Sequence, residues 1–152
     1  MIKELLQGRL FGHPVHIMLV HFPVALLPLS FVTDLTGLIT NDKTFYLLGF
    51  YLASAGSLSG LVAASFGLID LMNLKQSSKE QRIAIVHGAL GGMWVTTFTI
   101  IAGIQLKEFP AIENPGIFVL IIKGAVTIGM FYSNFLGGEL VLKYNVGHKG
   151  NN

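Results

Sequence analysis

Four long apolar stretches constrain the fold of this chain more than any other feature of its sequence. They cover residues 16–39, 45–72, 83–106 and 117–142. A helix of about 20 residues crosses the hydrocarbon core of a bilayer, which is about 30 Å thick. Each stretch is therefore predicted to be a transmembrane helix. The short connections between them predict an all-α, polytopic, up-down four-helix bundle, with residues 1–152 forming a single membrane domain.

The composition agrees with a membrane protein and excludes several functional classes. Only 12% of the residues are charged, which is roughly half the share found in soluble domains. The chain has no cysteine, which excludes disulfides, a cysteine nucleophile, cysteine-ligated iron–sulfur clusters and covalent c-type haem. The ten Lys and Arg are scattered beside apolar runs, so they are interpreted as topology signals and no nucleic-acid partner is expected.

The distribution of basic residues predicts the orientation in the membrane. The N-terminal tail, the connection before residue 83 and the C-terminal tail carry most of them, whereas the opposite side has only Lys43 and Lys107. The positive-inside rule then places both termini in the cytoplasm, and we expect a multi-pass protein of the bacterial inner (plasma) membrane. Residues 1–12 are predicted to be an interfacial segment, because Ile2, Leu5, Leu6 and Leu10 share one helical face.

Ionisable side chains gather near the predicted inner ends of the spans. They are His13, His16, His21, Asp70, His87 and Glu139. Such side chains are costly at membrane depth and usually mark a functional site or an internal pair. His21 and His87 lie about 7 to 10 Å inside their helix starts at 1.5 Å per residue, so they can share one layer. Two imidazoles at one depth of a bundle suit axial ligation of haem b.

Other assignments of these residues stay open. His16 competes with His21, because the two point about 140° apart on one helix and only one can face the bundle axis. His13 is a further alternate. The chain could instead be a divalent metal-binding or transport protein. Its site, for a metal such as zinc, would then use residues of the same cluster, which are His13, His16, Asp70, His87 and Glu139. In a third interpretation the protein is a non-catalytic structural subunit of a membrane complex, and hydrogen bonds within the cluster hold its helices together.

Further residues are placed relative to this cluster. Arg82 is expected at the inner rim, where it could pair with haem propionates. Trp94 shares a helical face with His87 and is predicted to wall the same pocket. Asp34 and Lys123 lie within the first and fourth spans and are predicted to form a buried ion pair. No nucleophile–base pair or paired catalytic carboxylates stand out, so a redox carrier or subunit is favoured over a stand-alone enzyme.

A weak internal echo suggests that a two-helix unit is repeated in parallel, as a 2+2 pseudo-repeat. His21 precedes Asp70 by 49 residues, and His87 precedes Glu139 by 52. The acidic ends also read alike, Phe66-Gly-Leu-Ile-Asp-Leu and Phe135-Leu-Gly-Gly-Glu-Leu. An axis along the membrane normal would relate the two units and place a histidine of each unit beside the centre.

The motif Gly12-His-Pro-Val-His-Ile-Met-Leu-Val-His-Phe-Pro-Val-Ala-Leu26 resembles the opening signature of a family of small prokaryotic membrane proteins, domain-of-unknown-function family 2231. Similarity continues at Gly67-x-x-Asp70, at Arg82 and His87, and at Leu136-Gly-Gly-Glu-Leu-Val141. Proteins that look like this one often accompany Rieske-type or c-type cytochrome domains. The resemblance therefore implies electron transfer by a haem, with a quinone, Rieske-type or c-type cytochrome partner. Assembly as a homo-oligomer or within a larger membrane complex stays open.

Overall fold

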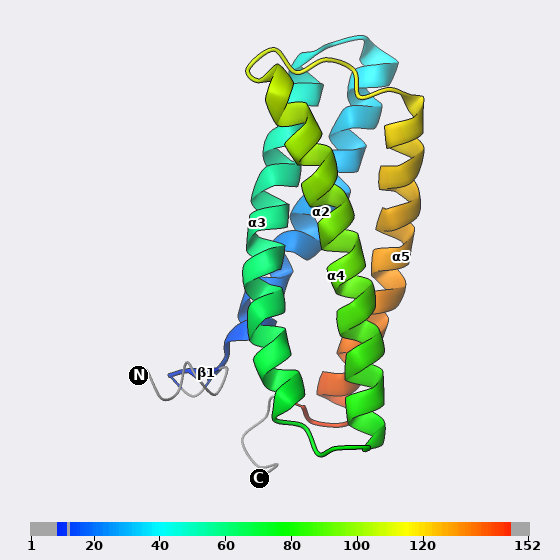
Figure 1. Cartoon of the computed structure of the whole chain (residues 1–152). Coiled ribbons are helices and arrows are strands. Elements are labelled where there is room, and N and C mark those ends of the chain that lie inside the picture. The colour runs from blue at the N-terminus through cyan, green and yellow to red at the C-terminus, as the bar shows by residue number, and fades with distance from the viewer. Residues whose placement is uncertain (1–8, 12, 147–152) are drawn as a thin grey trace.

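Four long helices make up most of the chain in the computed structural model, which describes residues 9–11 and 13–146. They are α2 (Val15–Thr40), α3 (Thr44–Met72), α4 (Lys79–Gln105) and α5 (Ile117–Leu142), and the 3-10 helix η1 (Leu106–Glu108) follows α4. All four are long and apolar enough to span a membrane. The chain reverses direction at each connection (Figure 1). The predicted all-α, four-span, up-down architecture is therefore confirmed.

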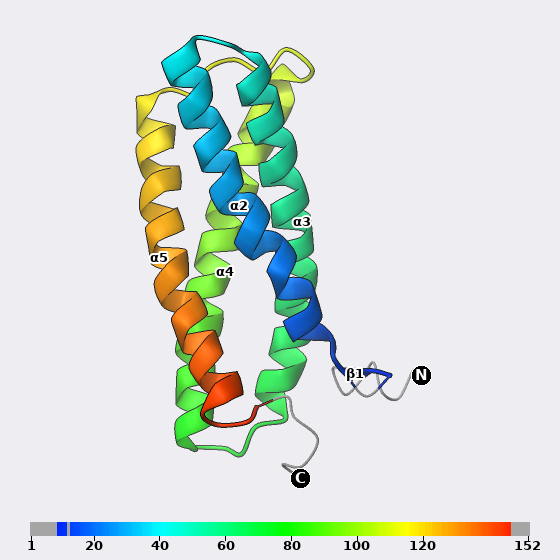
Figure 2. The same cartoon turned by 180° about the vertical axis from the view of Figure 1, so that it is seen from behind.

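Two ends of the bundle are distinguished below as they lie in Figure 1. The α2–α3 and α4–α5 connections lie at the upper end, and the α3–α4 connection and β1 lie at the lower end. Each of α2 and α4 packs against both α3 and α5, so α2 and α4 face one another diagonally across the bundle axis. Figure 2 shows that α2 is tilted: it runs near α5 at the upper end and approaches α3 at the lower end. The α2 and α5 helices therefore diverge toward the lower end.

The helix starts and ends follow local chemistry. α4 begins at Lys79, before the predicted start at residue 83, because Ser78 caps it. Ser78 Oγ accepts a hydrogen bond from the Gln81 backbone N–H at 3.1 Å, and Gln81 Oε1 accepts one from the Ser77 N–H at 2.8 Å. This reciprocal pair resembles a capping box. α2 ends where Asn41 adopts a left-handed conformation, with φ of 55°.

A short strand pair precedes α2. β1 (Arg9–Leu10) runs antiparallel to β2 (His13–Pro14), with Leu10 opposite His13. The predicted interfacial segment 1–12 placed Leu10 on a helical face, and this part of the prediction is wrong because Leu10 lies in a strand. Residues 1–8 and 12 of that segment lie outside the described residues.

The buried positions repeat along the chain. On α3 and α5 the same pattern recurs after 70 positions: Phe50, Ala53, Gly56, Ser57, Gly60 and Ala63 are buried, and so are Leu120, Lys123, Val126, Thr127, Met130 and Ser133. On α2 and α4 it recurs after 71 positions, from Leu27, Ser30 and Asp34 to Phe98, Ile101 and Gln105. The burial pattern therefore agrees with a 2+2 repeat of helix pairs.

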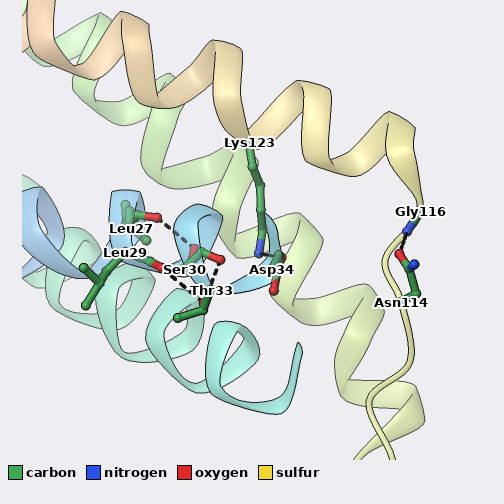
Figure 3. A network of polar contacts seen from close by, with 8 residues as sticks. All are labelled: Leu27, Leu29, Ser30, Thr33, Asp34, Asn114, Gly116 and Lys123. Atoms are coloured by element: carbon green, nitrogen blue, oxygen red, sulfur yellow. Dashed lines mark hydrogen bonds and ion pairs between the residues drawn. The ribbon is translucent and has the colours of Figure 1, made fainter. Parts of the chain in front are cut away.

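A buried ion pair joins α2 to α5 in the upper half. Lys123 Nζ lies 2.6 Å from Asp34 Oδ2, and both side chains are 0% exposed (Figure 3). Gly49 of α3 leaves the space that the carboxylate fills, because a Cβ atom at this position would collide with Asp34 Oδ1. The predicted pairing of Asp34 with Lys123 is therefore confirmed, and it links α2 to α5 at the end of the bundle where the two helices run close together.

Candidate functional site

His16 is the second residue of α2 and is oriented by a hydrogen bond to α3. Its Nδ1 lies 2.8 Å from the carbonyl oxygen of Ala63. A carbonyl only accepts hydrogen bonds, so Nδ1 carries a proton and donates it to this oxygen. Gly67, one turn further along α3, sits against the ring, since a Cβ atom there would lie 3.0 Å from His16 Nδ1.

His87 of α4 repeats this arrangement on α5. Its Nδ1 lies 2.8 Å from the carbonyl oxygen of Ser133 and 3.2 Å from Ser133 Oγ. Gly137, one turn further along α5, sits against the ring as Gly67 does against His16. His87 follows His16 by 71 positions, Ser133 follows Ala63 by 70, and Gly137 follows Gly67 by 70. The repeat therefore supplies one histidine, one carbonyl and one glycine from each helix pair.

The two histidines meet across the bundle axis. Their ring centres lie 6.3 Å apart, and their planes are inclined by 74°. Both Nε2 atoms have no hydrogen-bond partner within residues 9–11 and 13–146, because the Nδ1 atoms make the only bonds of these rings there. Two imidazole rings are thus held at one level with their Nε2 atoms unused by these hydrogen bonds, an arrangement that suits a pair of metal ligands when the rings are neutral.

A large cavity surrounds the histidine pair in the lower half of the bundle. It has a volume of about 690 Å³ and is lined by residues of α2, α3, α4 and α5, most of them apolar. Gly88, Gly91 and Gly92 of α4 contribute to the wall, and a Cβ atom at Gly88 or Gly92 would meet nothing within 4 Å. The site is therefore a large apolar cavity that contains two histidine side chains.

We predict that the glycines beside the rings are needed for this geometry. A Cβ atom at Gly137 would lie 2.9 Å from His87 Cε1. Gly137→Ala is therefore expected to push the ring away from the Ser133 carbonyl and to lower the free energy of unfolding by about 1–3 kcal/mol. Circular dichroism during a titration with sodium dodecyl sulfate in mixed micelles measures this change.

Gly138→Ala is the matched control for that substitution. A Cβ atom at Gly138 would meet no atom within 4 Å. This variant is expected to match the wild type or exceed it slightly, because alanine favours the helical conformation. Equal stability of the two variants would contradict the packing role assigned to Gly137.

The structure corrects the prediction that His21 is the histidine facing His87. His21 is exposed on α2, and its Nδ1 lies 3.4 Å from the Met18 carbonyl of the same helix. It contributes to the edge of the cavity, whereas His16, the predicted alternate, stands next to His87. The depth of His21 along its helix favoured it as the partner of His87. The tilt of α2 and the hydrogen bond to the Ala63 carbonyl instead turn His16 toward the bundle axis.

Two more predicted residues lie away from the cavity. His13 is exposed on β2, and Arg82 is exposed on the first turns of α4. Neither is among the described residues that line the cavity, and those lining residues include no Lys or Arg. The predicted contact of Arg82 with haem propionates is therefore not supported by its position.

The predicted metal cluster is not assembled. Asp70 lines the cavity, but Glu139 faces Lys143, whose Nζ lies 3.2 Å from its carboxylate. The hydrogen bond to Glu139 raises the pKa of Lys143. Within the described part of the chain, no group of three or more His, Asp or Glu side chains could hold a metal ion. A zinc site built from His13, His16, Asp70 and Glu139 therefore lacks structural support.

Trp94 lies where the sequence predicted it, in the wall of the cavity that holds His87. Its indole ring packs against Gly129 of α5. Sequence reasoning missed Ala63, Ser133, Gly67 and Gly137, which orient the rings. The signal that could have found them is the common spacing of 70 positions that separates Ala63 from Ser133 and Gly67 from Gly137.

Comparison with known proteins shows that the chain matches one protein family. A sequence model for the family described as predicted membrane protein (DUF2231) matches residues 12–150. No curated protein and no solved structure matches the chain. The match covers nearly the whole sequence and agrees with four apolar helices of membrane-spanning length. The chain is therefore a multi-pass membrane protein that belongs to the DUF2231 family.

Proposed function

We propose that this protein is a membrane-embedded, b-type cytochrome-like electron carrier that binds haem between His16 and His87. The spacing of the two rings carries the proposal. Two imidazoles that bind one metal from opposite sides, each through a bond of about 2 Å, place their ring centres roughly 6 Å apart. The two ring centres in this protein lie 6.3 Å apart. One iron atom between the rings fits this spacing.

The hydrogen bonds of the two rings support the same assignment. A histidine that binds a metal commonly donates its other ring N–H to a backbone carbonyl, which fixes the tautomer and the ring orientation. His16 and His87 both do so, with Ala63 and Ser133 as acceptors. This leaves Nε2 of each ring as the ligand atom. Bound in this way, the iron would supply one-electron transfer.

The cavity supports an organic cofactor over a bare metal ion. Pockets for cofactors and other small molecules have volumes of about 300–1,000 Å³ and mostly apolar linings. The cavity around the histidines, at about 690 Å³, falls in this range. A bare divalent ion needs no such space and would need further ligands, and no third His, Asp or Glu joins the pair among the residues described. We therefore propose haem b as the cofactor. Its proposed electron partners are a membrane quinone and a Rieske-type or c-type cytochrome protein.

An absorption spectrum of the detergent-purified protein tests the proposal directly. We expect a sharp α-band after reduction with dithionite, and pyridine haemochrome extraction should give stoichiometric haem b. The expression host is supplied with ample haem precursor, so that cofactor shortage does not limit loading. A colourless protein under these conditions would contradict the proposal. The histidines would then have the structural role of joining neighbouring helices by hydrogen bonds.

We further propose that the lower end of the bundle faces the cytoplasm of a bacterial inner membrane. The connection between α3 and α4 carries Lys75, whereas the connection between α4 and α5 carries Lys107. Because the chain has no cysteine, Lys75→Cys and Lys107→Cys give single labelling sites at opposite ends. A membrane-impermeant maleimide is expected to label Lys107→Cys in intact cells and Lys75→Cys only after permeabilisation. The reverse pattern would contradict the positive-inside assignment.

A further inference from the structure

The histidine cavity is built from equivalent positions of the two halves of the repeat. The α2 residues that line it, from His16 to Val24, recur in the lining on α4 after 71 positions. The α3 residues that line it, from Gly60 to Leu71, recur in the lining on α5 after 70 positions. Each side of the cavity therefore has a counterpart, and the two sides can be compared position by position.

The two sides differ most between α2 and α4. Three lining residues of α2 correspond to glycines of α4: Ile17 to Gly88, Val20 to Gly91 and His21 to Gly92. A Cβ atom at Gly88 or Gly92 would meet no atom within 4 Å, so open space lies beside this part of α4. The repeat therefore leaves a hollow on the α4 side where the α2 side carries larger side chains.

The cavity reaches the outside of the bundle between α3 and α4, and we call this gap the α3–α4 opening. Five lining residues of these two helices are exposed: Ala64, Leu68, Ile85, Gly88 and Ala89. Among the described lining residues of α2 and α5, only His21 is exposed. Above the opening α3 lies close to α4, since a Cβ atom at Gly60 would lie 2.8 Å from Val95 Cγ2. Figure 1 shows that the two helices diverge toward the lower end.

The α3–α4 opening faces lipid. Both helices are long and apolar enough to span a membrane. On α3 the opening is bordered by Ala64 and Leu68, which precede the helix end at Met72 by two turns and one turn. On α4 it is bordered by Gly88, which lies more than two turns inside the helix start at Lys79. A ligand that passes through this opening therefore comes from the bilayer and has to be soluble in lipid.

The wall of the cavity favours a neutral ligand that carries a hydrogen-bond acceptor. The described lining includes Asp70 but no Lys or Arg, whereas anionic lipid headgroups bind at basic pockets. Trp94 lines the cavity, and its buried Nε1–H has no acceptor in the described part of the chain. A buried donor without a partner is costly. An acyl chain offers no acceptor, whereas the ring carbonyl of a quinone does.

Trp94 is far enough from the histidine pair to serve a second ligand. It follows His87 by seven residues on α4, which corresponds to about 10 Å along the helix. A group held between the histidines and a ring at Trp94 can therefore occupy different parts of the same cavity. The hollow beside the α4 glycines lies between these two levels, because Gly88, Gly91 and Gly92 lie between the two residues in the helix.

We propose that a membrane quinone enters the cavity through the α3–α4 opening. Its flat ring lies beside the α4 glycines, one ring carbonyl accepts a hydrogen bond from Trp94 Nε1, and its isoprenoid tail extends into the lipid. The choice of a quinone rests on the proposed function, in which a quinone is an electron partner. The opening and its chemistry stand apart from that function, because they do not depend on what binds between the histidines.

Photolabelling tests the inference. Purified full-length protein in lipid nanodiscs is irradiated with an aryl-azide analogue of decylubiquinone, and labelled residues are identified by mass spectrometry. We expect labels on α3 and α4 around the opening, and we expect excess decylubiquinone to suppress them. Gly88→Leu fills the open space beside this glycine and is expected to reduce the suppressible labelling about tenfold. Ala64→Leu, on the opposite rim, is expected to act in the same way.

Two further variants control for helix substitution and test the donor. Gly103 is also an exposed glycine of α4 with no atom within 4 Å of a Cβ, but it does not line the cavity. Gly103→Leu should therefore keep the wild-type labelling. Trp94→Phe keeps an aromatic ring without the N–H, and it should raise the decylubiquinone concentration that halves the labelling about fivefold. An unchanged concentration would overturn the assignment of Trp94 as the donor.

The outcomes separate this inference from the haem proposal. Labelling that decylubiquinone does not suppress would overturn it, and so would suppressible labelling confined to α2 and α5. Equal labelling of Gly88→Leu, Ala64→Leu and Gly103→Leu would also overturn it. Absorption spectra of the same samples report haem independently. A colourless protein whose suppressible labelling is lost in Gly88→Leu would support the quinone site and contradict the proposed electron carrier. A haem-loaded protein without suppressible labelling would do the opposite.

Discussion

Replacing either His16 or His87 with alanine is expected to abolish the bis-histidine haem spectrum, whereas His21→Ala is expected to preserve it. Only His16 and His87 face one another, with ring centres 6.3 Å apart. His21 is exposed and its Nδ1 lies near the carbonyl of its own helix. Disturbing even an outer hydrogen bond of a metal ligand weakens binding by about 10–100-fold, so loss of the ligand itself should exceed that range. The reduced-minus-oxidised spectrum and the ratio of haem to protein measure the effect.

Free imidazole distinguishes ligand loss from misfolding in these variants. His87→Ala opens a space in the cavity wall, and added imidazole can enter it and bind iron if the histidine is an axial ligand. Recovery of the spectrum at millimolar imidazole is therefore expected. A purely structural histidine would give no recovery, because free imidazole does not restore a link from α4 to the Ser133 carbonyl. Persistence of the bis-histidine spectrum in His87→Ala, or its loss in His21→Ala, would refute the ligand assignment.

The fold was predictable because hydropathy alone locates a membrane span. Four stretches of sufficient length admit few alternatives, and the observed helices lie at the predicted positions. The Asp34–Lys123 pair was predictable for a related reason, since two opposite charges at similar depth in one bundle have no better partner than each other. The depth of a residue along a helix can be predicted from a sequence whenever the two ends of that helix can be predicted.

The choice between His16 and His21 depends on a quantity that the sequence does not contain. The two differ by about 140° around the same helix, and the rotation of α2 is set by its packing on α3. Gly67 and the Ala63 carbonyl receive the His16 ring there. The same limitation explains the metal cluster: Asp70, Glu139 and His13 were grouped by depth, yet they face different surroundings in the bundle.

Internal repetition is the feature that would have resolved the ambiguity. A spacing of 70 to 71 positions aligns His16 with His87, Ala63 with Ser133 and Gly67 with Gly137. The repeat predicted in the sequence analysis aligned His21 with His87 and Asp70 with Glu139, which is a different register. That register was chosen from depth along the helices, whereas the 70–71 spacing relates residues that pack against a neighbouring helix. Buried contacts are therefore the better guide to the register of a repeat.

Lys123→Met is expected to lower the free energy of unfolding by about 3–5 kcal/mol, because it leaves the carboxylate of Asp34 buried and uncompensated. Both side chains are 0% exposed, and the shared contact is 2.6 Å long. Methionine keeps an unbranched apolar stem of similar length, so packing beside Phe98 changes little. A loss of this size is a large share of the stability of a typical domain. Titration with sodium dodecyl sulfate, followed by circular dichroism, measures it.

A double variant and a surface pair isolate the charge effect. Asp34→Asn combined with Lys123→Met removes both charges and is expected to recover about 2 kcal/mol relative to Lys123→Met alone. Lys43 and Glu113 form an ion pair of 2.8 Å at the upper surface, with side chains 70% and 55% exposed. Lys43→Met should therefore change stability by no more than about 1 kcal/mol. If Lys123→Met lowers the free energy of unfolding by no more than Lys43→Met does, the buried pair contributes nothing beyond a surface contact. The upper half of the bundle would then hold together without the link between α2 and α5 that this pair provides.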